Sequence, residues 1–207
     1  MNESSKQNNY NEYDNFAFHP YNILLVLLLS SIGALFIAFS AAFVYTRVQS
    51  GLPPVKLPNL FFFNTFVLLT TSVAMRSGKF AYKNDKASVY QRALFVTLLL
   101  TFLFLGLQIS AWMQLFDRNV FLTTDNSASY LYLLSGLHFI HVVAGLPFLF
   151  SFLLTARKRL KEPVSGLVYF SDPAKSLKLR LLSIYWHFLD GLWLYLLLFF
   201  QINYWFS

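Results

Sequence analysis

The stretch that decides the fold is Leu131–Leu154, LYLLSGLHFIHVVAGLPFLFSFLL, which contains no lysine, arginine, aspartate or glutamate. About 20 mostly apolar residues are enough for a helix to cross the hydrocarbon core of a bilayer. Backbone amides in lipid have no water to bind, so a spanning stretch of this kind must be helical. The sequence therefore predicts a transmembrane helix at this position.

Four further apolar runs flank this stretch along the chain. The whole chain is 57% hydrophobic and 12% charged, whereas a soluble domain usually carries about 25% charged residues. Cysteine is absent, which excludes disulfides and thiolate metal sites. We therefore expect an all-α membrane protein, a five-helix transmembrane bundle, whose other spans are residues 21–45, 60–74, 94–112 and 181–201.

The basic residues are divided unequally between the two ends of these spans. Thirteen of the 16 lysines and arginines lie in the N-terminal tail or in the loops after the second and fourth spans. Basic loops stay in the cytoplasm, so the N-terminus is expected inside and the C-terminus in the periplasm. Residues 1–20 are then a polar cytoplasmic tail, and residues 21–207 form the bundle. Because the net charge of +7 lies in these loops, we expect no nucleic-acid partner.

Polar residues inside the spans are the candidates for function, because each is costly in lipid. His138 and His141 lie three residues apart on one helix face. Haem or metal ligation is one interpretation, and contact with neighbouring helices or lipid is the other. Two histidines at this spacing cannot hold one haem between them, so the second interpretation is favoured, and no metal ligand or catalytic residue is predicted.

The last span suggests a phospholipid headgroup site. Arg180, His187 and Asp190 share one helix face, and His187 lies about 9 Å from the expected cytoplasmic start of the span. Arginine and histidine at that depth can meet anionic phosphates. The alternative is a local His–Asp hydrogen bond that only holds the helix. The candidate lipid-binding residues are Arg180, Trp186, His187, Asp190, His138 and His141.

The first span carries a row of small residues at four-residue spacing. Such a row lets helix backbones approach closely, either within the bundle or toward a partner. It consists of Ser30, Ala34, Ala38 and Ala42.

Four segments, in chain order, resemble signatures of subunit III of the haem–copper terminal oxidases (cytochrome c oxidase subunit 3 family). The last, SIYWHFLDGLW, is similar to the family's YWHFVDxxW motif, and GLHFIHVVAG is similar to its GLHxxHVxxG motif. The other two resemble GxQxxEW and LPxxNTxxLLxSS. The segments are Leu57–Ser72, Gly106–Trp112, Gly136–Gly145 and Ser183–Trp193.

The resemblance, to the short five-helix bacterial form, implies an accessory role in a complex of the bacterial inner (plasma) membrane. It implies no redox centre on this chain, structural phospholipids bound to it, and haem and copper held by the partner subunits. It implies packing beside the catalytic subunit I, together with subunit II, in an aa3-type cytochrome c oxidase that reduces oxygen and translocates protons. A larger respiratory supercomplex is a further candidate partner.

Several alternatives stay open at this point. The equivalent subunit of a quinol oxidase has the same signatures, because the electron donor meets other subunits. A stand-alone membrane transporter and a haem-ligating membrane cytochrome are functions of a different class. The chain also departs from the family pattern, because Ile32 and Ala111 stand where the family usually has glutamates. These departures favour a lipid-holding, subunit-stabilising role over a proton-handling one.

Overall fold

A computed structural model describes residues 20–51, 56–160 and 163–205, so the predicted tail at residues 1–20 lies almost wholly outside the described residues. Five long helices within these ranges are long and apolar enough to cross a membrane, as the sequence predicted. A short sixth helix, α5, was not predicted. The helices are α1 Pro20–Ser50, α2 Asn59–Lys83, α3 Ala87–Asp117, α4 Asn126–Arg159, α5 Pro163–Phe170 and α6 Pro173–Trp205.

The helices are longer than the predicted spans, and α2 shows why. Its predicted span stopped at residue 74, where the charged residues begin, but the helix continues to Lys83. It ends in a tight turn in which Asp85 has a positive φ of 54° and the Lys86 amide donates to the Ala81 carbonyl at 3.0 Å. Hydropathy marks the residues that suit lipid, whereas the backbone remains helical until a turn ends it.

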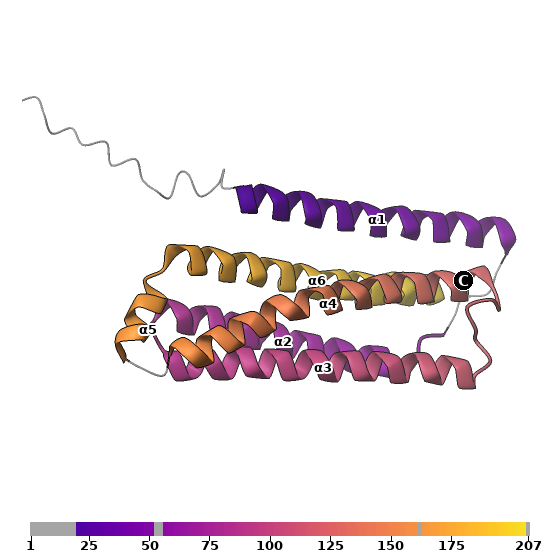
Figure 1. Cartoon of the computed structure of the whole chain (residues 1–207). Helices are drawn as coiled ribbons and strands as arrows, with labels where there is room; N and C mark the ends of the chain where they lie inside the picture. The colour runs from indigo at the N-terminus through magenta and orange to yellow at the C-terminus, as the bar shows by residue number, and fades with distance from the viewer. Residues whose placement is uncertain (1–19, 52–55, 161–162, 206–207) are drawn as a thin grey trace, which may run out of the picture.

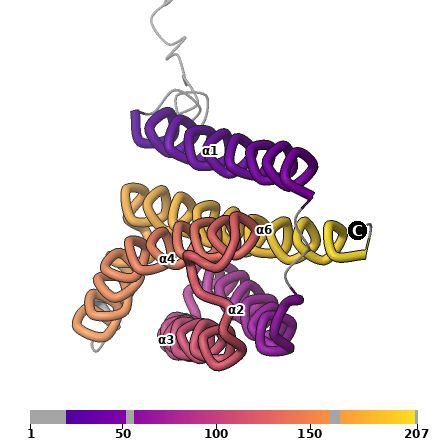
Figure 2. Tube along the Cα trace, turned by 90° about the vertical axis from the view of Figure 1, so that its right-hand side faces the viewer, coloured from indigo at the N-terminus to yellow at the C-terminus, as the bar shows by residue number. Residues whose placement is uncertain are grey.

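The helices pack around α6. Figures 1 and 2 show α6 between α1 and α2, with α4 crossing beside it and α3 next to α2. Both ends of α6 are joined to α1 by an arginine–asparagine contact. The Arg47 guanidinium donates to the Asn203 backbone carbonyl at 2.6 Å, and the Arg180 guanidinium donates to the Asn22 side chain at 3.0 Å. α1 is therefore held to α6 near each of its ends.

α1 presents one narrow face to the rest of the bundle. Its buried residues are Ile32, Phe36, Ser40 and Phe43. The predicted packing row lies elsewhere on the helix: Ser30, Ala34 and Ala38 are exposed, and Ala42 is half-buried. Three of these four small residues therefore face away from the bundle.

The buried interior has two clusters along the bundle. One joins α1 to the other helices through large aromatic side chains, including Phe43, Phe61, Phe104 and Trp193. The second joins α2, α3, α4, α5 and α6, and includes Tyr82, Tyr90, Tyr169 and Trp186. In it, the Tyr82 hydroxyl donates to the Tyr169 backbone carbonyl at 3.0 Å and so fixes α5 against α2. The helix that hydropathy missed is thus held by aromatic packing and a hydrogen bond.

Candidate functional site

The six residues proposed from the sequence do not gather at one place. His138 and Trp186 are buried between helices, His141 lines a cavity, and His187 and Asp190 face α2. Arg180 donates to Asn22 of α1 instead. The sequence grouped residues that share a helix face, but their partners come from different helices.

His138 is a contact between α4 and α6. Its side chain is fully buried, and the ring Nε2–H donates to the Leu189 backbone carbonyl at 3.1 Å. The ring packs against Trp193, whose centroid lies 5.0 Å away. Trp193 in turn donates its indole N–H to the Thr65 hydroxyl of α2 at 3.0 Å. Polar side chains of this kind join helices in lipid, because an unpaired polar group is costly there.

The motif Gly136–Gly145 forms a second contact between α4 and α6. The Tyr185 hydroxyl of α6 donates to the His141 backbone carbonyl at 2.7 Å. The His141 ring donates to the Leu137 carbonyl of its own helix at 2.7 Å. At Gly145 an added Cβ would lie 2.8 Å from the Trp186 ring, so the ring fills the space that a side chain would need. Glycine is required here by close approach.

The remaining signatures join α3 to its neighbours. The Asn64 side-chain amide of α2 donates to Gln108 of α3 at 3.0 Å, and both residues are fully buried. The Trp112 indole donates to the Ser135 hydroxyl of α4 at 3.1 Å. All four segments of the resemblance therefore supply side chains that connect one helix to another.

His187 and Asp190 form a small polar cluster with Ser72 of α2. The Ser72 hydroxyl lies 2.7 Å from His187 Nδ1, and this nitrogen lies 3.9 Å from Asp190 Oδ2. Asp190 is 6% exposed, and its Oδ2 has no hydrogen-bond partner among the described residues. The His187 side chain is 39% exposed. The cluster thus combines a buried carboxyl with an imidazole that reaches the protein surface.

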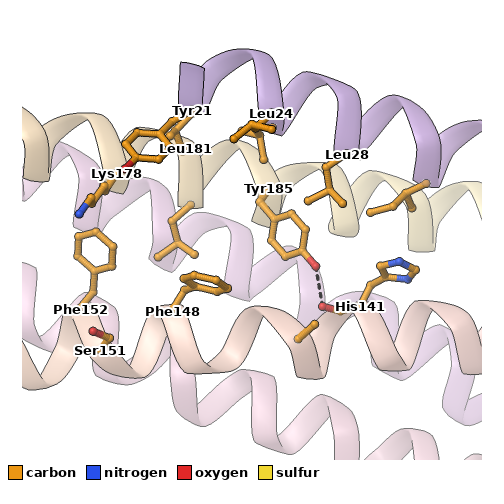
Figure 3. Close-up of a pocket in the computed structure, with 14 residues that line it drawn as sticks. Tyr21, Leu24, Leu28, His141, Phe148, Ser151, Phe152, Lys178, Leu181 and Tyr185 are labelled. Atoms are coloured by element: carbon orange, nitrogen blue, oxygen red, sulfur yellow. Dashed lines mark hydrogen bonds between the residues drawn. The ribbon is translucent and has the colours of Figure 1, made fainter. Parts of the chain in front are cut away.

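A cavity of about 690 Å³ separates α1 from α4 and α6. Figure 3 shows its walls: Tyr21, Leu24 and Leu28 come from α1, and Phe148 and Phe152 lie on α4 opposite. Most of the lining is apolar. Its polar side chains are at Tyr21, Ser151 and Lys178 toward one end, and at Tyr185 and His141 further along.

Sequence reasoning selected only His141 among the residues of this cavity. Lys178, Leu181 and Tyr185 follow each other at helical spacing on α6, a signal that the sequence did contain. The gap beside α1 could not be foreseen, because α1 is apolar on all sides. Ile32, at the position of a family glutamate, is buried and lines the same cavity as His141. Ala111, at the other such position, is fully buried.

The fold and the contacts between its helices define a class of protein. It is a multi-pass helical membrane subunit whose signature residues hold the helices together. Within the described ranges, no group of three histidine, cysteine, aspartate or glutamate side chains could hold a metal ion. The sequence model of the family described as "Cytochrome c oxidase subunit III" matches residues 26–207. The chain therefore belongs to the cytochrome c oxidase subunit III family, which carries no metal site of its own.

Individual relatives agree with this assignment. Cytochrome c oxidase subunit 3 of Synechocystis sp. is 30% identical over 83% of this chain and 71% of its own length. The Bacillus subtilis protein of the same name is 30% identical over 82% of this chain and 80% of its own length. A probable quinol oxidase subunit 3 of Staphylococcus aureus is 28% identical over 64% of this chain and 61% of its own length.

These findings settle the class of protein and its place in the cell. The chain is subunit III of a haem–copper oxidase and a multi-pass protein of the bacterial plasma membrane. Membership of the family implies association with other oxidase subunits and a place in the respiratory chain. Relatives of both names match this chain, so the electron donor of the complex is a separate question.

Proposed function

We propose that this chain is the non-redox accessory subunit III of an aa3-type cytochrome c oxidase, that it holds a phospholipid, and that it stabilises the catalytic subunit I during reduction of oxygen to water. Family membership supports the place in the oxidase. The relatives from Synechocystis and Bacillus subtilis named cytochrome c oxidase subunit 3 support cytochrome c as the donor. The observation that carries the lipid part is the cavity beside α1.

The dimensions and chemistry of this cavity suit a phospholipid acyl chain. Its α1 wall runs from Tyr21 to Ile32, about 16 Å at the rise of an α-helix. Its volume of about 690 Å³ falls within the range of roughly 300–1,000 Å³ that is usual for ligand pockets. Lys178 lies at the end that the charge distribution assigns to the cytoplasm. An ammonium group there can attract an anionic headgroup while the acyl chain of the lipid extends toward His141.

Lipid retention by the purified oxidase tests this part. Removal of one positive charge near a headgroup costs about 1 kcal/mol, which is close to a fivefold loss of affinity. We expect Lys178→Gln to lose phosphatidylglycerol about fivefold more readily in native mass spectrometry than wild type. Lys158→Gln is the matched control, because Lys158 is exposed and does not line the cavity. Equal lipid retention by the two variants would contradict the proposal.

The headgroup site that the sequence predicted at Arg180 and His187 is separate from the cavity site at Lys178. Their hydrogen-bond partners differ, because Arg180 reaches α1 and His187 reaches α2. Lys79 is nevertheless a positively charged neighbour of both of them. Lipid mass spectrometry on Arg180→Ala and His187→Ala oxidase tests this site, and unchanged retention in both variants would exclude it.

The stabilising role is tested by turnover with and without the chain. We expect oxidase that lacks subunit III to begin at much of its normal rate and then lose activity during sustained turnover. Oxidase that keeps full activity over many turnovers without the chain would count against the role. Subunit III should protect the oxidase only when it is present from the start of turnover. Adding it after activity has been lost should therefore not restore the activity.

A quinol oxidase is the second candidate, which the Staphylococcus aureus relatives favour. Steady-state oxygen consumption by the purified complex distinguishes the two. Rapid turnover with reduced cytochrome c supports the first proposal, and turnover with a quinol alone supports the second. The fold of this chain is compatible with both, since the donor binds to other subunits.

A further inference from the structure

One face of α6 is exposed along the middle of the bundle. It consists of Ile184, His187, Gly191, Tyr195 and Leu198, called here the His187 face. These residues recur at the three- and four-residue spacing of a single helix face. The face extends about 21 Å along the helix axis, and α6 lies between α1 and α2 (Figures 1 and 2).

His187 makes the hydrocarbon chains of lipid an unfavourable cover for this face. Ser72 lies four residues before Arg76 on α2, which places the Ser72–His187 contact about 6 Å deeper in the membrane than that charge. His187 uses Nδ1 for Ser72, and its Nε2 has no hydrogen bond among the described residues. Ionisable side chains at such depth face protein or a polar cavity, because hydrocarbon offers them no partner.

Gly191 adds a geometric reason. A Cβ built there meets no atom within 4 Å, so its own bundle gives no packing reason for glycine at this position. Glycine in the middle of a helix is destabilising relative to alanine. An exposed bare backbone in a membrane helix permits close approach of another helix. Gly191 follows His187 by four residues, so the polar group and the bare backbone are adjacent on one face.

The charges nearby indicate the chemistry of the partner. Arg76 and Lys79 of α2 interact electrostatically with His187. Arg76 is exposed, and Lys79 is half-buried. The only carboxyl in the cluster, Asp190, is buried and faces inward. A surface with two cationic side chains, an imidazole and no exposed acid complements a partner that carries a hydrogen-bond acceptor or a carboxylate.

We propose that the His187 face is the contact surface for a transmembrane helix of another oxidase subunit, which presents an acceptor side chain to His187 and passes close to Gly191. The inference rests on membership of an oxidase complex, which family membership implies, and adds the face and the residues of contact. A helix fits this face for two reasons. It can follow the face along its whole length and approach closely at Gly191, and it can hold an acceptor side chain at the depth of His187.

Photo-crosslinking in the intact oxidase tests the proposal. A photoreactive phenylalanine replaces Tyr195, an exposed aromatic residue of the His187 face, in one preparation and Phe102, an exposed aromatic residue of α3, in a control. Gly191 itself stays unchanged, so that the close approach is preserved. We expect a covalent product between position 195 and a second oxidase subunit, and little or none from position 102. Products with lipid alone from position 195, or equal subunit products from both positions, overturn the proposal.

Substitution provides a second measurement. Gly191→Leu should leave the thermal unfolding midpoint of the chain unchanged or slightly raised, because leucine is the better helix former. It should lower the amount of haem–copper subunit that copurifies by about tenfold, as expected for loss of one close helix contact. Gly106→Leu should copurify like wild type. Equal copurification by the two variants overturns the proposal. If wild-type chain itself recovers no haem–copper subunit, the oxidase assignment fails as well, and that outcome is distinguishable from failure of the face alone.

Discussion

The contact at Gly145 permits a quantitative prediction for the variant Gly145→Ala. The new methyl group would lie 2.8 Å from Trp186 Cζ3 and 2.9 Å from Tyr185 Cε1, whereas carbon atoms normally pack at about 3.5–4.0 Å. Trp186 is 2% exposed, and Tyr185 is held by its hydrogen bond to the His141 carbonyl. Neither ring can move aside freely, so α4 and α6 must separate.

The magnitude follows from two opposing contributions. Overpacking of a well-packed interior costs about 1–3 kcal/mol. Alanine gains about 1 kcal/mol over glycine in a helix interior. We therefore expect the free energy of unfolding to fall by up to about 2 kcal/mol in Gly145→Ala. Gly136→Ala on the same helix is the control, because a Cβ there meets no atom within 4 Å. It should be as stable as wild type or up to about 1 kcal/mol more stable.

Unfolding in mixed micelles, with increasing dodecyl sulfate and circular dichroism as the signal, measures both variants. We predict that Gly145→Ala unfolds at a lower dodecyl sulfate fraction than Gly136→Ala. We also predict that Trp186→Leu, which removes the obstructing ring, makes the added methyl group less costly. Equal unfolding of the two alanine variants would falsify the argument that the Trp186 ring requires glycine at this position.

Three other predictions use the same unfolding assay. Asn64→Leu should cost about 1 kcal/mol by leaving the Gln108 side-chain oxygen unpaired, and the double variant Asn64→Leu/Gln108→Leu should regain most of it; additive losses would contradict the buried pair. Ile32→Glu should destabilise the chain, because it places a carboxyl in the membrane. Since positions 32 and 141 line one cavity, the loss should be about 1–2 kcal/mol smaller with His141 present than in a His141→Leu background. Equal losses in the two backgrounds would exclude the pairing. The Lys175 ammonium and backbone amides at the start of α6 lower the pKa of Asp172 below its ordinary 3.8, so its charged form stabilises the fold above that pH. Asp172→Asn should therefore cost less than about 1 kcal/mol at neutral pH, and the difference should shrink as the pH falls through and below 3.8; a difference that grows in acid would contradict this sign.

The chemistry of the site was only partly predictable. The sequence identified His138, His141 and His187 as the polar residues that the membrane must accommodate. It could not identify the partner of His138, which is a backbone carbonyl 51 residues away at Leu189. A carbonyl leaves no mark in a sequence, since every residue has one. For the same reason Tyr185 could not be connected to His141, although both belong to recognised segments.

What the sequence determined by itself is the number of spans and the family. Hydropathy is a local property, so each of the five apolar runs predicts its own helix whatever its neighbours are. The signatures identify the family because each is a set of contact-forming residues at fixed spacing. The charge distribution adds an expected direction for the bundle.

Only the tertiary structure decided which face of each helix packs and what lies between them. In lipid an inward face need not be more apolar than an outward one, so hydropathy does not fix the rotation of a helix about its axis. Most of the row of small residues on α1 therefore faces outward, while Ile32 and Phe36 face inward. The cavity beside Lys178 and the exposed His187 face follow from the same rotations, which depend on the joint packing of all the helices.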